Sequence, residues 1–146
     1  MYKHILIPTD GSEIADKAVE AGLKFAKWAG ARVTAFTAMP EYQIPSGEIV
    51  SRTAESLPEF ERRSMEGAKR LLDAIAQRAR QAGVELGTDA ALSDRPWQAI
   101  IEAARKHGCD LIFIASHGRR GFSALLHGSE TREVLTHSTI PTLVYR

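Results

Sequence analysis

Apolar residues along this chain switch repeatedly between two spacings, and this switching limits the possible folds more than any other feature. Residues His4–Pro8 and 111–114 are short apolar runs without alternation, as expected for strands covered on both faces. Between such runs, apolar residues recur every three or four positions, as on one face of a helix. The alternation of strands and helices predicts an α/β fold, in which a parallel sheet has helices on both faces. We expect a single domain of residues 1–146.

Caps and turn residues place the individual elements. The predicted strands are His4–Pro8, 33–39, 84–92 (an edge strand), 111–114 and Thr142–Tyr145. The first predicted helix lies between Ser12 and Gly30, and the second runs from Pro58 to Gly83. The third has Ser93 or Asp94 as its cap and Pro96 in its first turn, and it ends at Gly108. The fourth is Ser129–His137. Residues 40–57 have no sustained period, which is typical of a functional lid or a disordered loop.

Charge and cysteine content limit the partners and the compartment. The chain has 19 lysines and arginines against 18 aspartates and glutamates, a formal net charge of +1. That balance does not favour binding to nucleic acid or to a membrane surface, and no apolar stretch approaches the roughly 20 residues of a membrane span. Cys109 is the only cysteine, so we expect a reducing, cytoplasmic compartment and a buried, unreactive thiol.

Two of the predicted strands run into unusual loops. Residues 8–12 follow the first strand, and residues 115–121 follow the fourth, where nine residues (119–127) separate Gly118 from Gly128. Ligands of open parallel sheets bind beyond the carboxyl ends of the strands. Gly118 and the N–H groups at the start of the last helix would form a phosphate site. The alternative is that these glycines make only a turn and an ordinary helix cap.

The second of these loops resembles a known family. The segment Ala115-Ser116-His117-Gly118, nine residues, and then Gly128-Ser129 is similar to the G-x-x-G-(nine)-G-S/T motif of ATP-binding universal stress proteins. Residues 5–12, 109–112 and 140–145 are also similar, so the likeness covers essentially the whole chain. It implies a doubly wound, Rossmann-like sheet of five parallel strands in the order 3-2-1-4-5, with the first and fourth strands side by side.

The resemblance also implies which residues bind the ligand, an ATP molecule or else AMP or ADP, with Mg²⁺ or Mn²⁺ held through the phosphates. Asp10 would accept from the ribose hydroxyls, and Ala38 would offer backbone groups to the adenine. Main-chain amides of the last helix would hold the outer phosphates, with the Ser129 and Thr131 hydroxyls as further donors. The implied site is Pro8, Thr9, Asp10, Ala38, Ala115, His117, Gly118, Gly128, Ser129, Glu130 and Thr131.

One position departs from the motif, because Ala115 stands where the family has its first glycine. If that position requires a positive φ, alanine costs about 1–2 kcal/mol. If φ is negative, the methyl group matters only where it touches the ribose. Charge-assisted hydrogen bonds are worth about 1.5–3 kcal/mol each, so we expect the site to be weakened at most.

Three functions stay open at this stage: a regulatory protein of the stress response that binds ATP, a slow ATP hydrolase or nucleotidyl-transfer enzyme, and a dimeric scaffold without nucleotide. The loop Thr9-Asp10-Gly11-Ser12 has neither the HxGH nor the SGGxDS motif of related enzymes, and the motif holds no lysine that could stabilise a departing phosphate. We therefore expect a binding protein. The resemblance also implies a homodimer that pairs the C-terminal strands, whereas a covered monomer edge is the alternative.

Overall fold

The centre of the protein is a five-stranded sheet. The computed structural model describes residues 1–43, 55–117 and 128–146. Its strands are β1 (His4–Pro8), β2 (Arg32–Met39), β3 (Leu86–Leu92), β4 (Leu111–Ala115) and β5 (Thr142–Tyr145). They lie in the order β3-β2-β1-β4-β5, and every neighbouring pair is parallel. The strand order implied by the resemblance is therefore confirmed.

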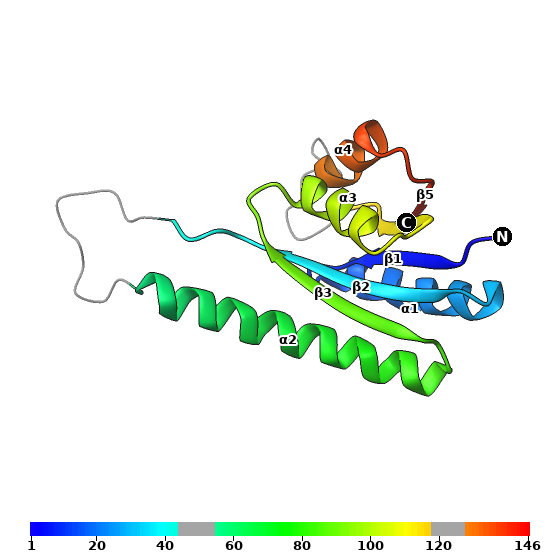
Figure 1. Cartoon of the computed structure of the whole chain (residues 1–146), viewed down its shortest axis with the longest axis horizontal. Coiled ribbons are helices and arrows are strands. Elements are labelled where there is room, and N and C mark those ends of the chain that lie inside the picture. The colour runs from blue at the N-terminus through cyan, green and yellow to red at the C-terminus, as the bar shows by residue number, and fades with distance from the viewer. Residues whose placement is uncertain (44–54, 118–127) are drawn as a thin grey trace.

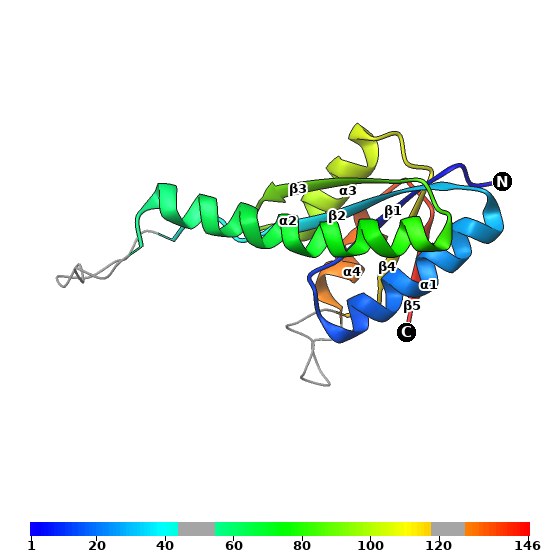
Figure 2. The same cartoon turned by 90° about the horizontal axis from the view of Figure 1, so that it is seen from below.

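Helices cover both faces of this sheet. α1 (Glu13–Ala29) and α2 (Leu57–Ala82) pack on one face, and α3 (Pro96–Lys106) and α4 (Ser129–His137) pack on the other (Figures 1 and 2). Ile5 and Ile7 of β1 belong to the core under α1 and α2, whereas Leu6 belongs to the core under α3 and α4. Each face of β1 therefore needs apolar side chains, which explains its unbroken apolar run.

Local signals set most of the element ends. The Ser12 hydroxyl caps α1, and Gly30 ends that helix in the left-handed conformation, at φ 65°, as predicted. α2 begins at Leu57, one residue before the predicted Pro58, because Ser56 and Glu59 form a capping box there. Gly83 ends α2 as predicted, at φ 73°.

The predicted cap of α3 was wrong. Neither Ser93 nor Asp94 caps the helix, since the residue at the cap position is Arg95, whose side chain makes no capping hydrogen bond. The Ser93 hydroxyl instead accepts the N–H of Arg95 at 3.1 Å, and the Asp94 carboxylate accepts the N–H of Glu41 at 2.9 Å. These side chains therefore hold the segments that follow β3 and β2.

Candidate functional site

A cavity of about 1090 Å³ opens at the carboxyl ends of the strands. It lies where the strand order reverses, because β1 has β2 on one side and β4 on the other. This is the position at which doubly wound sheets bind ligands. Residues that follow β1, β2 and β4 line it together with the first turn of α4.

The structure brings most of the sequence-predicted site residues to this one cavity. Gly118 lies outside the described residues. The other predicted residues all line the cavity: Pro8, Thr9, Asp10, Ala38, Ala115, His117, Gly128, Ser129, Glu130 and Thr131. They come from four separate parts of the chain, and only the fold makes them neighbours.

The loop after β1 is held by its own polar groups. The N–H of Thr9 donates to the Phe36 carbonyl at 2.8 Å, which ties the loop to β2. The Asp10 carboxylate accepts the N–H of Ser12 at 2.9 Å, and the Thr9 hydroxyl accepts the N–H of Gly11 at 3.1 Å. Thr9 is buried and Asp10 is half-buried at the cavity wall, so the loop presents the carboxylate of Asp10 in a fixed position.

Gly128 allows α4 to start directly against the end of β4. Its φ is 67°, a conformation that residues with a side chain rarely adopt. A Cβ atom at this position would overlap the backbone carbonyl oxygen of Ser116. Glycine is therefore required at position 128 both for the backbone conformation and for the close approach of α4 to Ser116. This approach brings the amino end of α4 to the cavity.

The first turn of α4 has N–H groups that can bind an anion. The first intrahelical hydrogen bond joins the N–H of Arg132 to the Gly128 carbonyl at 2.7 Å. The N–H groups of Ser129, Glu130 and Thr131 precede that bond, and the helix dipole favours negative charge beside them. A phosphate at this end of the cavity would meet these amides and the exposed Ser129 side chain.

Two side chains at this helix start are occupied in other contacts. The expectation that the Thr131 hydroxyl would donate to a phosphate was wrong, because this buried hydroxyl donates to the Ala115 carbonyl at 2.7 Å. The Glu130 carboxylate accepts the N–H of Trp97 at 2.7 Å, at the amino end of α3. These two side chains therefore fix α4 to β4 and to α3, while its backbone amides face the cavity end.

The conformation of Ala115 decides between the two alternatives left open by the sequence. Within residues 1–43, 55–117 and 128–146, no residue other than glycine has a positive φ. Ala115 therefore carries no left-handed strain, and it is buried at the end of β4. Its methyl group matters only where a ligand touches it.

His117 follows Ala115 and also lines the cavity, half-buried. Its Nδ1 lies 3.0 Å from the Ser116 hydroxyl. The Ser116 hydroxyl therefore helps to hold the His117 ring.

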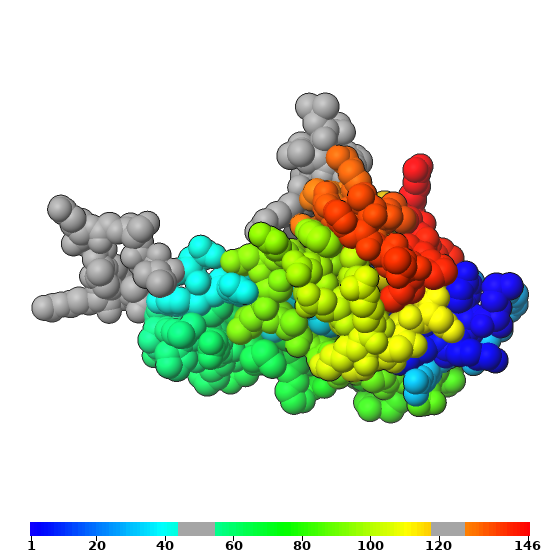
Figure 3. All heavy atoms as spheres, turned by 45° about the horizontal axis from the view of Figure 1, so that its top comes forward, coloured from blue at the N-terminus to red at the C-terminus, as the bar shows by residue number. Residues whose placement is uncertain are grey.

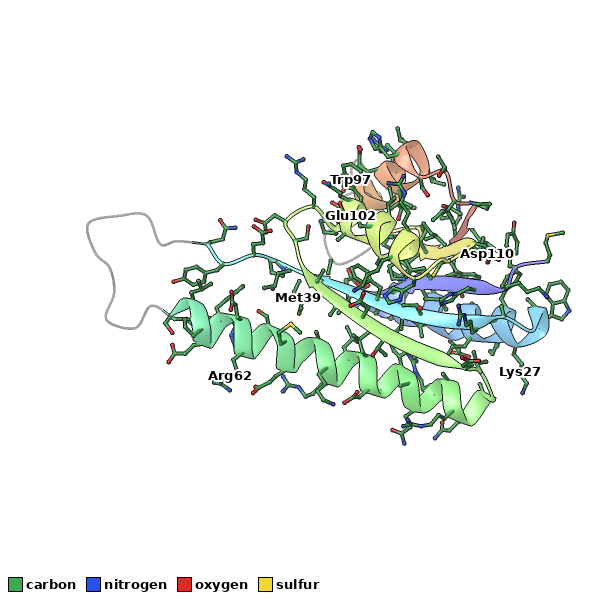
Figure 4. The ribbon with its side chains drawn as sticks, in the orientation of Figure 1. Lys27, Met39, Arg62, Trp97, Glu102 and Asp110 are labelled. Atoms are coloured by element: carbon green, nitrogen blue, oxygen red, sulfur yellow. The ribbon has the colours of Figure 1, made fainter. Side chains whose placement is uncertain are left out.

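Sequence reasoning missed the wall that α2 contributes. Arg63, Gly67 and Arg70 line the cavity on this side. They lie on one face of α2 at spacings of four and three residues, so their helical period was the signal that could have identified them. Met39, labelled in Figure 4 between β2 and α2, lines the same region.

Outside the cavity, the predicted burial of Cys109 is confirmed. The thiol is buried, and burial raises its pKa to about 11. Such a thiol stays protonated at neutral pH and is a poor nucleophile.

Residues 1–43, 55–117 and 128–146 contain neither a candidate metal site nor a helix suited to span a membrane. No cluster of histidine, cysteine, aspartate and glutamate side chains there has the arrangement of a metal site. No helix in those segments combines the length and apolar character needed to cross a bilayer.

Comparisons with known proteins agree with this geometry. The model of the universal stress protein family matches residues 1–146. Universal stress protein MJ0577 of Methanocaldococcus jannaschii is 30% identical to this chain, over all of it and 96% of that protein.

Two solved structures share the fold. UspA from Lactobacillus plantarum has a TM-score of 0.83 at 23% identity, over 99% of this chain and 98% of the other. A universal stress protein from Archaeoglobus fulgidus, solved in complex with dAMP, has a TM-score of 0.71 at 18% identity, over 99% and 98%. With its sheet order, its cavity at the reversal of that order and a family match along its whole length, the chain belongs to the universal stress protein family.

Proposed function

We propose that this protein binds ATP in the cavity at the carboxyl ends of β1 and β4 and acts as a regulatory protein of the stress response. The observation that carries the proposal is the contact of Gly128 with the Ser116 carbonyl, which leaves no room for a side chain. It brings the amino end of α4 to the cavity. A helix start built in this way suits a phosphate group.

The nucleoside would lie along the rest of the cavity. Asp10 and Ala38 both line the cavity. Asp10 would accept from the ribose hydroxyls, and the end of β2 at Ala38 would offer backbone groups to the adenine. The Archaeoglobus relative was solved with dAMP, which supports an adenine nucleotide. ATP is preferred over AMP because the three first-turn amides of α4 can reach its outer phosphates.

A divalent ion, Mg²⁺ or Mn²⁺, would accompany the nucleotide. Because Mg²⁺ is usually held by phosphate oxygens and water together with one or two protein groups, it needs no dedicated protein cage. Binding rather than catalysis is proposed because the described lining residues include no lysine to stabilise a departing phosphate. The proposed location of the protein is the cytoplasm, because a chain with Cys109 as its sole cysteine forms no intrachain disulfide.

Calorimetry with ATP and AMP tests the proposal on the wild type and on the variant Gly128→Ala. A methyl group at Gly128 would force α4 away from Ser116, so we expect at least a tenfold loss of ATP affinity and a smaller loss for AMP. Gly30→Ala is the matched control, because Gly30 also has a positive φ, 65°, but no atom within 4 Å of an added Cβ. Equal affinities of the wild type for ATP and AMP would refute the outer-phosphate assignment, and rapid phosphate release would favour the enzyme.

We also propose a homodimer formed through β5. Among the described strands, β5 pairs with β4 alone and lies at the sheet edge. The Pro141 carbonyl accepts from Ile112 of β4, and the Tyr145 carbonyl accepts from Ser116, directly after β4. By alternation, Val144 directs its N–H outward, where a second copy could accept it. Light scattering should give twice the chain mass, and Val144→Pro should give monomers. A monomeric wild type at micromolar concentration would contradict the dimer.

A further inference from the structure

The wall that α2 gives the cavity has a charge pattern different from that of the other walls. Both arginines among the described lining residues, Arg63 and Arg70, belong to α2. The carboxylates of the lining come from other elements, and each accepts a backbone N–H. The pairs are Asp10 with Ser12, Asp94 with Glu41 and Glu130 with Trp97. Each acidic side chain of the lining thus accepts a backbone N–H, whereas the basic charges gather on one helix face.

The two arginines differ in how they are held. Arg63 makes two hydrogen bonds of 2.8 Å to the Glu55 carboxylate, and its guanidinium lies 5.6 Å from the centre of the Phe60 ring. Arg70 has neither a carboxylate nor a hydrogen-bond partner within the described part of the chain. An added Cβ at Gly67 would lie 4.0 Å from a guanidinium nitrogen of Arg70, so this side chain folds back along α2 over Gly67.

The cavity is also large for a small-molecule site. Its volume of about 1090 Å³ exceeds the range of about 300–1,000 Å³ that is usual for small-molecule sites. α4 and α2 pack on opposite faces of the sheet, so the amino end of α4 and the arginines line different walls of this cavity. The Arg70 guanidinium, which has no partner in the described part of the chain and lines the cavity, is suited to a phosphate oxygen.

We propose that Arg63 and Arg70 form a second phosphate-binding subsite, so that the cavity accepts a dinucleotide whose bridging phosphate joins two nucleosides. This inference rests on the proposed function, because the first nucleotide occupies the site between β1, β4 and α4. A phosphodiester bridge carries one negative charge and leaves one ribose hydroxyl for Asp10. A second phosphate monoester on that ribose would place up to two charges beside the Asp10 carboxylate, which disfavours it.

Calorimetry with AMP, ATP and the linear 5′-phosphorylated dinucleotide of adenosine, pApA, tests the subsite. AMP is the reference, because pApA differs from it only by the second nucleotide. We expect the wild type to bind pApA at least tenfold more tightly than AMP. The variant Arg63→Gln/Arg70→Gln should lose that advantage, so that its affinities for pApA and AMP become equal.

Arg62→Gln is the matched control. Arg62 lies on the same helix but points away from the body of the protein, pairs with Glu66 at 3.0 Å and does not line the cavity (Figure 4). Its pApA affinity should equal that of the wild type. A melting temperature measured for each variant reports whether it is folded.

Two results would overturn the subsite: equal affinity of the wild type for pApA and AMP, or equal losses for both ligands in the double variant. Failure of the proposed function looks different. In that case AMP and ATP do not bind to the wild type at all, whatever happens with pApA.

Discussion

The hydrogen bond between Glu130 and Trp97 leads to a specific prediction about stability. The Glu130 carboxylate of α4 accepts the N–H of Trp97 at 2.7 Å, and α3 has no capping side chain of its own. α3 and α4 lie against each other in the space-filling view (Figure 3). Glu130 therefore caps α3 from a different helix, and it holds the first turn of α4 in place at the same time.

Removing this carboxylate should cost a measurable part of the free energy of unfolding. Loss of a capping side chain costs about 0.5–2 kcal/mol, and a hydrogen bond to a charged group contributes about 1.5–3 kcal/mol. Because Glu130 is half-buried and water can replace part of the contact, we expect Glu130→Ala to cost about 1–2 kcal/mol. For a chain of this size that corresponds to a Tm lowered by roughly 3–6 °C.

Urea unfolding followed by tryptophan fluorescence measures this loss. Glu130→Gln keeps an oxygen acceptor without the charge and should recover about half of the loss. Glu102→Ala is the control, since Glu102 is exposed on α3 (Figure 4) and accepts from Gln98, at 3.1 Å. The reasoning is refuted if Glu130→Ala unfolds within about 0.5 kcal/mol of the Glu102→Ala control, the usual range for surface changes.

Three further outcomes follow from the structure. Burial and the nearby charge of Arg32 lower the pKa of His4 in the folded protein. As the pH falls, the histidine of the unfolded chain is therefore protonated first. The free energy of unfolding should decrease below about pH 6.5. His4→Gln should flatten that dependence in urea titrations between pH 7.5 and 5; an unchanged slope would contradict it. Thr131→Val leaves the Ala115 carbonyl without its donor and should cost about 1–3 kcal/mol in urea unfolding, with Thr136→Val as the exposed control; equal costs would argue against the contact. Gly22→Ala would place a Cβ 2.6 Å from the Ile7 side chain. Although alanine favours the helix more than glycine does, we expect calorimetric melting to show that the free energy of unfolding falls by about 1–2 kcal/mol. A raised Tm would disprove the tight packing.

The elements of this fold were predictable because their signals are local. The unbroken apolar run of β1, the Ser12 cap and the left-handed Gly30 each act within a few residues, so the sequence alone indicates them. The bounds Ser129–His137 and Thr142–Tyr145 agree with the structure for the same reason. The strand order did not follow from periodicity, and it came from the family resemblance that the structure confirms.

Contacts between distant residues were decided only by the tertiary structure. The capping of α3 by Glu130 joins residues 33 positions apart, so no local pattern could replace the wrong prediction of Ser93 or Asp94. The Thr131 hydroxyl was expected to donate to a ligand but donates to the Ala115 carbonyl. This contact, too, joins residues far apart in the sequence, so no local pattern indicates it. The position of Arg70 at the cavity depends on how α2 packs beside β2. The helical period in the sequence shows which residues share a face of α2, but it does not show which part of the protein that face contacts.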